Sequence, residues 1–159
     1  MINVLPIATT VLAALLSIEP LHLDGYAPLT PAFTLMATYH WTIYRPGLLP
    51  APWLFFIGMV QDLLSGGLPG ETAVTLLLAR AIVLDQRHYF VDRPFPFIWA
   101  GFSLLTGGAM LFSWVLHSLL AAELLDLRGP VLRAVLTISI FPIASFLLGR
   151  SQRALIGAD

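Results

Sequence analysis

Long apolar blocks, separated by short segments rich in charge, proline and glycine, restrict the fold of this chain more than any other feature. The blocks cover residues 2–18, 26–44, 52–68, 71–84, 95–120 and 131–149. Only 11% of the residues are charged, against roughly 25% in an average soluble domain, and the mean hydropathy is +0.86. Too few polar residues remain to cover a water-facing surface of this size. The pattern predicts an all-α, polytopic membrane protein, with six transmembrane helices in one bundle and a single domain over residues 1–159.

The prolines predict where these helices start and bend. Some stand where a helix can begin, which the proline ring tolerates: Pro94, Pro96 and Pro130. Others lie inside or near a block, where each removes a backbone hydrogen bond: Pro6, Pro28, Pro31 and Pro142. We expect kinks or late helix starts at this second group.

The charges of the linkers predict the orientation. When alternate linkers are assigned to alternate sides, one side holds Arg45, Arg87, Arg93, Arg150 and Arg153. The other side holds Glu19, Asp24, Glu71, Glu123 and Asp126, together with Arg128 and with Arg133 if that side chain reaches the surface. Basic residues are enriched in cytoplasmic linkers. Both termini are therefore predicted to be cytoplasmic.

The central hairpin, residues 53–80, carries charges where the bilayer interior is expected. Its apex is Ser65-Gly66-Gly67-Leu68-Pro69-Gly70, and Asp62 and Arg80 lie in its two apolar arms. A lone charge there costs about 3 kcal/mol or more, so each needs a partner. We expect Asp62 to be held by hydrogen bonds either to a helix terminus or to Arg80.

Catalysis, metal binding and nucleic-acid binding find little support in the sequence. The histidines are scattered over different segments, at His22, His40, His88 and His117, and no metal-ligand or nucleophile motif accompanies them. The net charge of −1 and the dispersed arginines argue against nucleic acid as a partner. We predict a protein that is not an enzyme, with no cofactor, no metal site and no catalytic residue.

A family resemblance rests on the central hairpin. The pattern Gly58-x-x-x-Asp62-Leu63-Leu64-Ser65-Gly66, followed by Leu68-Pro69-Gly70, resembles the G-x-x-x-D-L-x-x-G-x-x-x-G signature of MreD, the rod shape-determining membrane proteins of bacteria. Chain length and number of blocks also fit that family. Outside the hairpin the resemblance is one of hydropathy only.

The resemblance implies a scaffold in the bacterial inner membrane that determines rod cell shape by organising lateral peptidoglycan synthesis. The implied partners are an MreC-like bitopic membrane protein, the lipid bilayer, and MreB, RodA and a penicillin-binding transpeptidase of the elongation machinery. On this interpretation, residues Gly58, Asp62, Ser65, Gly66, Gly70 and Arg80 form a structural or partner-binding hairpin. Gly58, one turn before Asp62, leaves a bare face that can receive another helix.

The same family is similar in fold to the S components of energy-coupling-factor vitamin transporters, which leaves an alternative open. The chain would then be a small-molecule, vitamin-like binding subunit, with a polar pocket lined by Glu71, Trp114, His117 and Glu123. Its first block departs from the A-x-x-x-A pattern of those subunits, since Ala13 is followed by Ser17 and Ala14 by Ile18. For the small-residue spacings Ala13/Ser17, Ser103/Gly107 and Ala109/Ser113, packing within the chain is favoured over a dimer interface.

Overall fold

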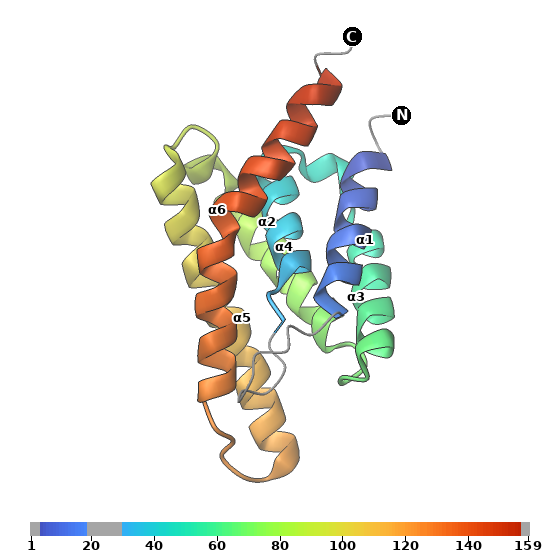
Figure 1. The fold of residues 1–159 in the computed structure, drawn as a ribbon, viewed down its shortest axis with the longest axis vertical. Coiled ribbons are helices and arrows are strands. Elements are labelled where there is room, and N and C mark those ends of the chain that lie inside the picture. Colours follow the sequence, from blue (N-terminus) through green and yellow to red (C-terminus); the bar gives the residue numbers. More distant parts are fainter. Residues whose placement is uncertain (1–3, 19–29, 157–159) are drawn as a thin grey trace.

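The computed structural model describes residues 4–18 and 30–156, and all regular structure in these residues is helical. The elements are α1 (Val4–Ile18), α2 (Phe33–Tyr44), the 3-10 turn η1 (Pro46–Leu48), α3 (Ala51–Ser65), α4 (Glu71–Phe90), α5 (Phe95–Ala121) and α6 (Arg128–Ile156). Figure 1 shows them as one helical bundle. Two helices, Phe95–Ala121 and Arg128–Ala154, are long and apolar enough to cross a membrane, and α1 and α3 are shorter apolar helices. Six membrane crossings stay a prediction.

The helices whose bounds differ most from those expected are α2, α4 and α6. Residues 26–29 of the block at residues 26–44 lie outside the described part. In the rest of that block the helix begins at Phe33, because Pro31 stands just before it. Helix α4 runs six residues past its expected end at Leu84, because no breaker occurs before Pro94 and Arg87 and His88 suit a helix C-terminus. Helix α6 starts before Pro130 and continues beyond Gly149 to Ile156.

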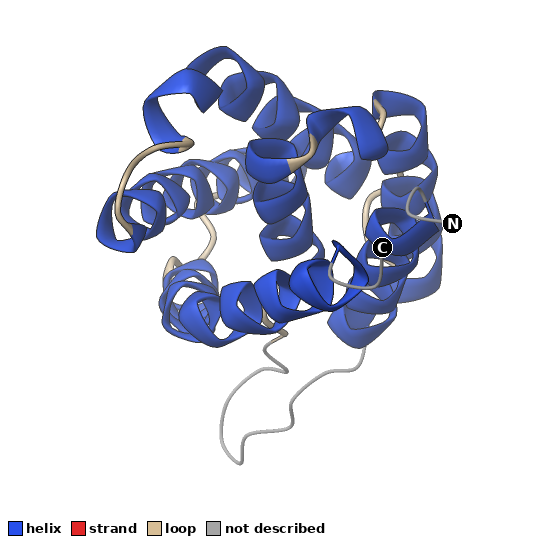
Figure 2. Ribbon diagram, turned by 90° about the horizontal axis from the view of Figure 1, so that it is seen from above, coloured by secondary structure: helices blue, strands red, loops and turns tan. Residues whose placement is uncertain are grey.

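Helix α2 lies at the centre of the bundle. Every residue from Thr34 to Ile43 is buried, and α2 contacts α1, α4, α5 and α6. Figure 2 shows the bundle from above. The Tyr39 ring packs edge-on against Phe102 and Phe141, which stack on each other with centroids 4.0 Å apart, and its hydroxyl donates to the Ile98 carbonyl. This aromatic cluster joins α2 to the two long helices.

The proline inside α6 has its missing hydrogen bond replaced from a neighbouring helix. Pro142 has no N–H to donate to the carbonyl of Ile138, four residues earlier. The indole Nε1 of Trp99 on α5 donates to that carbonyl at 3.0 Å. The polar group freed by Pro142 is therefore satisfied, and α5 and α6 are joined at this level.

The two ends of the bundle differ in what they contain. The first turn of α1 and the last turn of α6 lie at the same end, together with the α2–α3 and α4–α5 connections (Figure 1). The apex between α3 and α4 and the connection between α5 and α6 lie at the opposite end. All five arginines assigned to one side by the linker count belong to the first of these ends.

Candidate functional site

Asp62 closes the central hairpin by capping the helix that follows it. It lies in the last turn of α3 and is 3% exposed. Its carboxylate accepts the backbone N–H of Gly70 at 2.9 Å and that of Thr72 at 3.1 Å. These N–H groups belong to the first turn of α4, where intrahelical partners are lacking and the helix dipole favours a negative charge. Of the two partners left open by the sequence, the helix terminus is the one that Asp62 binds.

Glycines give the apex its backbone shape. Gly66 ends α3 in the left-handed conformation at φ +68°, and Gly70 begins α4 at φ +92°. The N–H groups of Gly66 and Gly67 and the hydroxyl of Ser65 all donate to the backbone carbonyl of Asp62. Asp62 therefore organises both halves of the turn, one with its main chain and the other with its side chain.

Gly58 brings the two arms of the hairpin into backbone contact. A Cβ atom at Gly58 would lie 2.5 Å from Ala73 Cα and 2.6 Å from Ala73 N. Gly58 and Asp62 share one face of α3, and α4 covers that face. The bare face expected to receive another helix is thus filled by the chain's own second arm.

Arg80 lies away from Asp62 and binds the segment that precedes α3. Its Nε donates to the Leu49 carbonyl at 3.1 Å, and Nη2 donates to that of Pro46 at 3.4 Å. Among the described residues, no ion pair joins Arg80 to Asp62. Arg87, two turns later on α4, donates similarly to the Ile43 carbonyl. The arginines of α4 therefore fix the segment that links α2 to α3.

The polar pocket of the alternative interpretation is formed only in part. Glu71 accepts a hydrogen bond from the Ser113 hydroxyl, and its second oxygen lies 3.6 Å from His117 Nε2. Arg133, which was counted with the linker charges only on the condition that its side chain reaches the surface, lines a cavity of about 60 Å³ with Glu71 and Ser113. Small-molecule sites usually measure about 300–1,000 Å³. The cavity is therefore too small for a vitamin-sized ligand.

The other two residues expected in that pocket do not reach it. Trp114 donates its indole N–H to the Leu125 carbonyl, and Glu123 is exposed. No group of three histidine, aspartate or glutamate side chains that could hold a metal ion occurs among residues 4–18 and 30–156.

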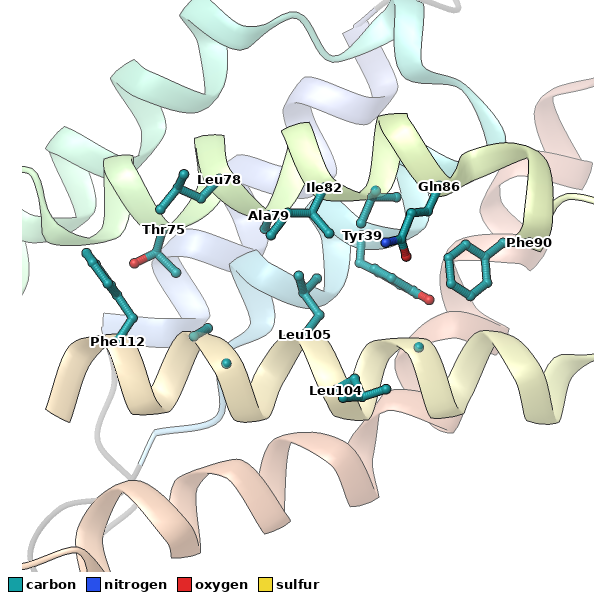
Figure 3. Close-up of a pocket in the computed structure, with 14 residues that line it drawn as sticks. Tyr39, Thr75, Leu78, Ala79, Ile82, Gln86, Phe90, Leu104, Leu105 and Phe112 are labelled. Atoms are coloured by element: carbon teal, nitrogen blue, oxygen red, sulfur yellow. The ribbon is translucent and has the colours of Figure 1, made fainter. Parts of the chain in front are cut away.

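An apolar groove of about 440 Å³ separates α4 from α5, and the sequence did not predict it (Figure 3). Helix α4 contributes Thr75, Leu78, Ala79, Ile82, Val83, Gln86 and Phe90, and α5 contributes Gly101, Leu104, Leu105, Gly108, Ala109 and Phe112, with Tyr39 of α2 at the base. A Cβ atom at Gly108 would have nothing within 4 Å. The glycines of α5 could have indicated a groove at this place. The sequence does not show, however, whether such a glycine faces a neighbouring helix or open space.

Comparison with known proteins identifies the family. The model of the family described as rod shape-determining protein MreD matches residues 1–148. The comparisons with curated proteins and with solved structures gave no match. The match covers far more of the chain than the hairpin motif, and an all-helical bundle with two long apolar helices is compatible with it. The chain belongs to the MreD family of rod shape-determining proteins.

Proposed function

We propose that this protein is a non-enzymatic scaffold of the bacterial elongation machinery, which determines rod shape by organising lateral peptidoglycan synthesis in the inner membrane. The family match over residues 1–148 carries this proposal. In the proposed arrangement, six helices cross the membrane and both termini are cytoplasmic. The position of the outer ends of α1 and α6 at one end of the bundle, with five arginines, supports that orientation.

The proposed partner is an MreC-like bitopic protein, and its single span would dock along the groove between α4 and α5. This groove is the outer face of the hairpin's second arm. Its lining is mostly apolar, and the small residues Gly108 and Ala109 allow a second backbone to come close, since nothing lies within 4 Å of a Cβ atom at Gly108. A whole helix is about 10–12 Å wide, so a groove of about 440 Å³ is too small to enclose one. It can receive the side chains along one side of a helix. MreB, RodA and a penicillin-binding transpeptidase are proposed as further members of the assembly.

Asp62 and Gly58 act indirectly in this proposal. They fix α4 against α3, so that Leu78 and Ile82 on the other side of α4 face the groove. A residue of this kind positions a binding surface without touching the partner.

Two neighbouring glycines of α5 allow a sharp test of the groove. Gly107 and Gly108 both face open space, but only Gly108 lines the groove between α4 and α5. We expect Gly108→Leu to fill the groove and lower capture of the MreC-like partner by about tenfold, since overpacking a contact costs roughly 1–3 kcal/mol. Gly107→Leu is the matched control and should capture the partner normally.

The measurement is co-purification of the partner with each variant, combined with microscopy of cells in which the variant replaces the native protein. Cells carrying Gly108→Leu should round up, whereas cells carrying Gly107→Leu should stay rod-shaped. Normal capture by a folded Gly108→Leu variant would exclude this groove as the docking site. Rod-shaped growth after depletion of the protein itself would contradict the scaffold function.

A further inference from the structure

A second pocket, of about 500 Å³, lies at the arginine-rich end of the bundle between α2, the start of α5 and the C-terminal half of α6. It is lined by His40, Tyr44, Phe95, Pro142, Ser145, Phe146, Gly149, Gln152 and Arg153. It shares no residue with the groove between α4 and α5. Unlike that groove, it is lined by a guanidinium, that of Arg153, and about half of its lining residues can form side-chain hydrogen bonds.

His40 is the residue that marks this pocket as a binding site. The side chain is buried at 3% exposure, with its ring against Trp41 and Tyr44. The side chain of Gln152 lies beside the imidazole. Neither ring nitrogen has a hydrogen-bond partner among the described residues. A neutral imidazole carries one donor and one acceptor, and burying both without partners is unfavourable. A ligand that both accepts and donates would satisfy them.

The remaining side chains define the charge of that ligand. Arg153 supplies a guanidinium, which its Nε bond to the Gly149 carbonyl holds along the pocket wall. Gln152, Ser145 and Tyr44 add neutral donors, and none of the described residues that line the pocket is a carboxylate. This set favours an anion, because guanidinium, amide and hydroxyl donors together match the oxygens of a phosphate.

We propose that this pocket binds the headgroup of an anionic phospholipid that carries hydroxyl groups, of the phosphatidylglycerol type. The phosphodiester accepts hydrogen bonds from Arg153 and Gln152, which line the pocket. Both His40 nitrogens are covered by protein atoms in this structure, so the phosphodiester and a headgroup hydroxyl reach them only when the Gln152 side chain turns aside. Phe95, Pro142 and Phe146 contact the adjoining glycerol and the start of the acyl chains. His40 lies one turn from the end of α2, which places the site at headgroup depth, where basic pockets between helices bind anionic lipids.

The test uses the purified full-length protein in detergent and native mass spectrometry. Phosphatidylglycerol and phosphatidylcholine with identical acyl chains are added in equal amounts. The wild type should retain phosphatidylglycerol at least about tenfold better, since charge-assisted hydrogen bonds are the strong ones. Arg153→Ala and His40→Leu should each remove most of this preference. If His40→Leu does not fold, the partly buried Gln152→Leu replaces it with the same expectation.

Arg150→Ala is the matched control, because Arg150 is an exposed arginine on the same helix that does not line the pocket. This variant should keep the lipid preference. If Arg150→Ala and Arg153→Ala lower the lipid preference equally, the preference comes from the general positive charge of the surface, and the proposal is overturned. Equal retention of the two lipids by the wild type would also overturn it. Displacement of the lipid by an equal concentration of soluble glycerol 3-phosphate would assign the pocket to a free phosphate ester instead.

Discussion

Helix α4 packs against two of its neighbours, α3 and α5, in opposite ways. Against α3 it packs backbone to backbone at Gly58 and Ala73, and Asp62 caps its first turn. Against α5 it leaves a groove of about 440 Å³, with Gly108 facing open space. Both contacts are rich in small apolar residues. The same residue type therefore closes one interface and opens the other.

The difference between these interfaces lies in what stands opposite each glycine. At Gly58 the opposing atoms are backbone atoms of Ala73, which cannot move without displacing a helix. At Gly101 they are ring atoms of Phe90 and the hydroxyl of Tyr39, which can shift by rotation. At Gly108 there are none. Alanine substitution at the three positions measures this gradation, because the chemical change is the same each time.

The largest effect is expected from Gly58→Ala. The added Cβ would overlap the backbone of Ala73 at 2.5 Å, so α3 and α4 must separate and the cap on α4 is disturbed. We expect a loss of about 3 kcal/mol or more in unfolding free energy, above the usual cost of overpacking. Thermal unfolding of the purified protein in detergent measures it. A melting temperature equal to that of the wild type would show that the arms are not in backbone contact.

Asp62→Leu should have the next largest effect, about 2–4 kcal/mol. It removes the acceptor of two backbone N–H groups and the negative charge at the helix N-terminus. Asp62→Asn is the matched control, because it keeps an acceptor of similar shape and should cost about half as much or less. The same unfolding assay compares them. If both variants lose stability equally, the charge rather than the hydrogen bonding holds the hairpin.

Gly101→Ala is expected to cost about 1 kcal/mol. Overpacking against the Phe90 ring at 2.6 Å costs roughly 1–3 kcal/mol, and replacing glycine by alanine in a helix returns about 1 kcal/mol. Pairing it with Phe90→Leu, which removes the opposing ring, should reduce the cost in a double-mutant cycle. Independent, additive losses would mean that Phe90 is not the obstacle.

Gly108→Ala should have the smallest effect and the opposite sign. Nothing lies within 4 Å of the added Cβ, so only the gain in helix propensity remains, up to about 1 kcal/mol. Thermal unfolding should show an unchanged or slightly raised melting temperature. A clear loss of stability would indicate that α4 and α5 close on each other, which would remove the groove and the proposed docking site together.

Several features of the fold and site could be predicted from sequence because they depend on neighbours along the chain. Apolar blocks and prolines predict α1, α3 and α5 to within a few residues, and the glycines predict the apex at Gly66 and Gly70. The sequence offered two partners for Asp62, a helix terminus and Arg80, but it could not decide between them. The positions of Asp62 and Arg80 along their helices set only the difference in their depth. Which group lies next to Asp62 depends on the conformation of the turn between the two helices.

Other features depend on segments that are distant in the sequence. The exposed fraction of Arg133, the unpartnered imidazole of His40 and the open space at Gly108 follow from which helix lies opposite. The hydrogen bond from Arg87 to the Ile43 carbonyl of α2 is also of this kind. The similarity to S components stays a prediction.

The sequence by itself determined that this chain is helical and apolar, where its hairpin turns, and to which family its central motif belongs. The helices and the turn follow from local propensity, from hydropathy and from the conformational freedom of glycine at two positions, whereas the family follows from the resemblance of the motif. Only the tertiary structure decided that Asp62 caps α4, that Gly58 is covered while Gly108 is open, and that His40 faces a pocket. A side chain's role in a bundle is set by the surface facing it, and that surface comes from a different part of the chain.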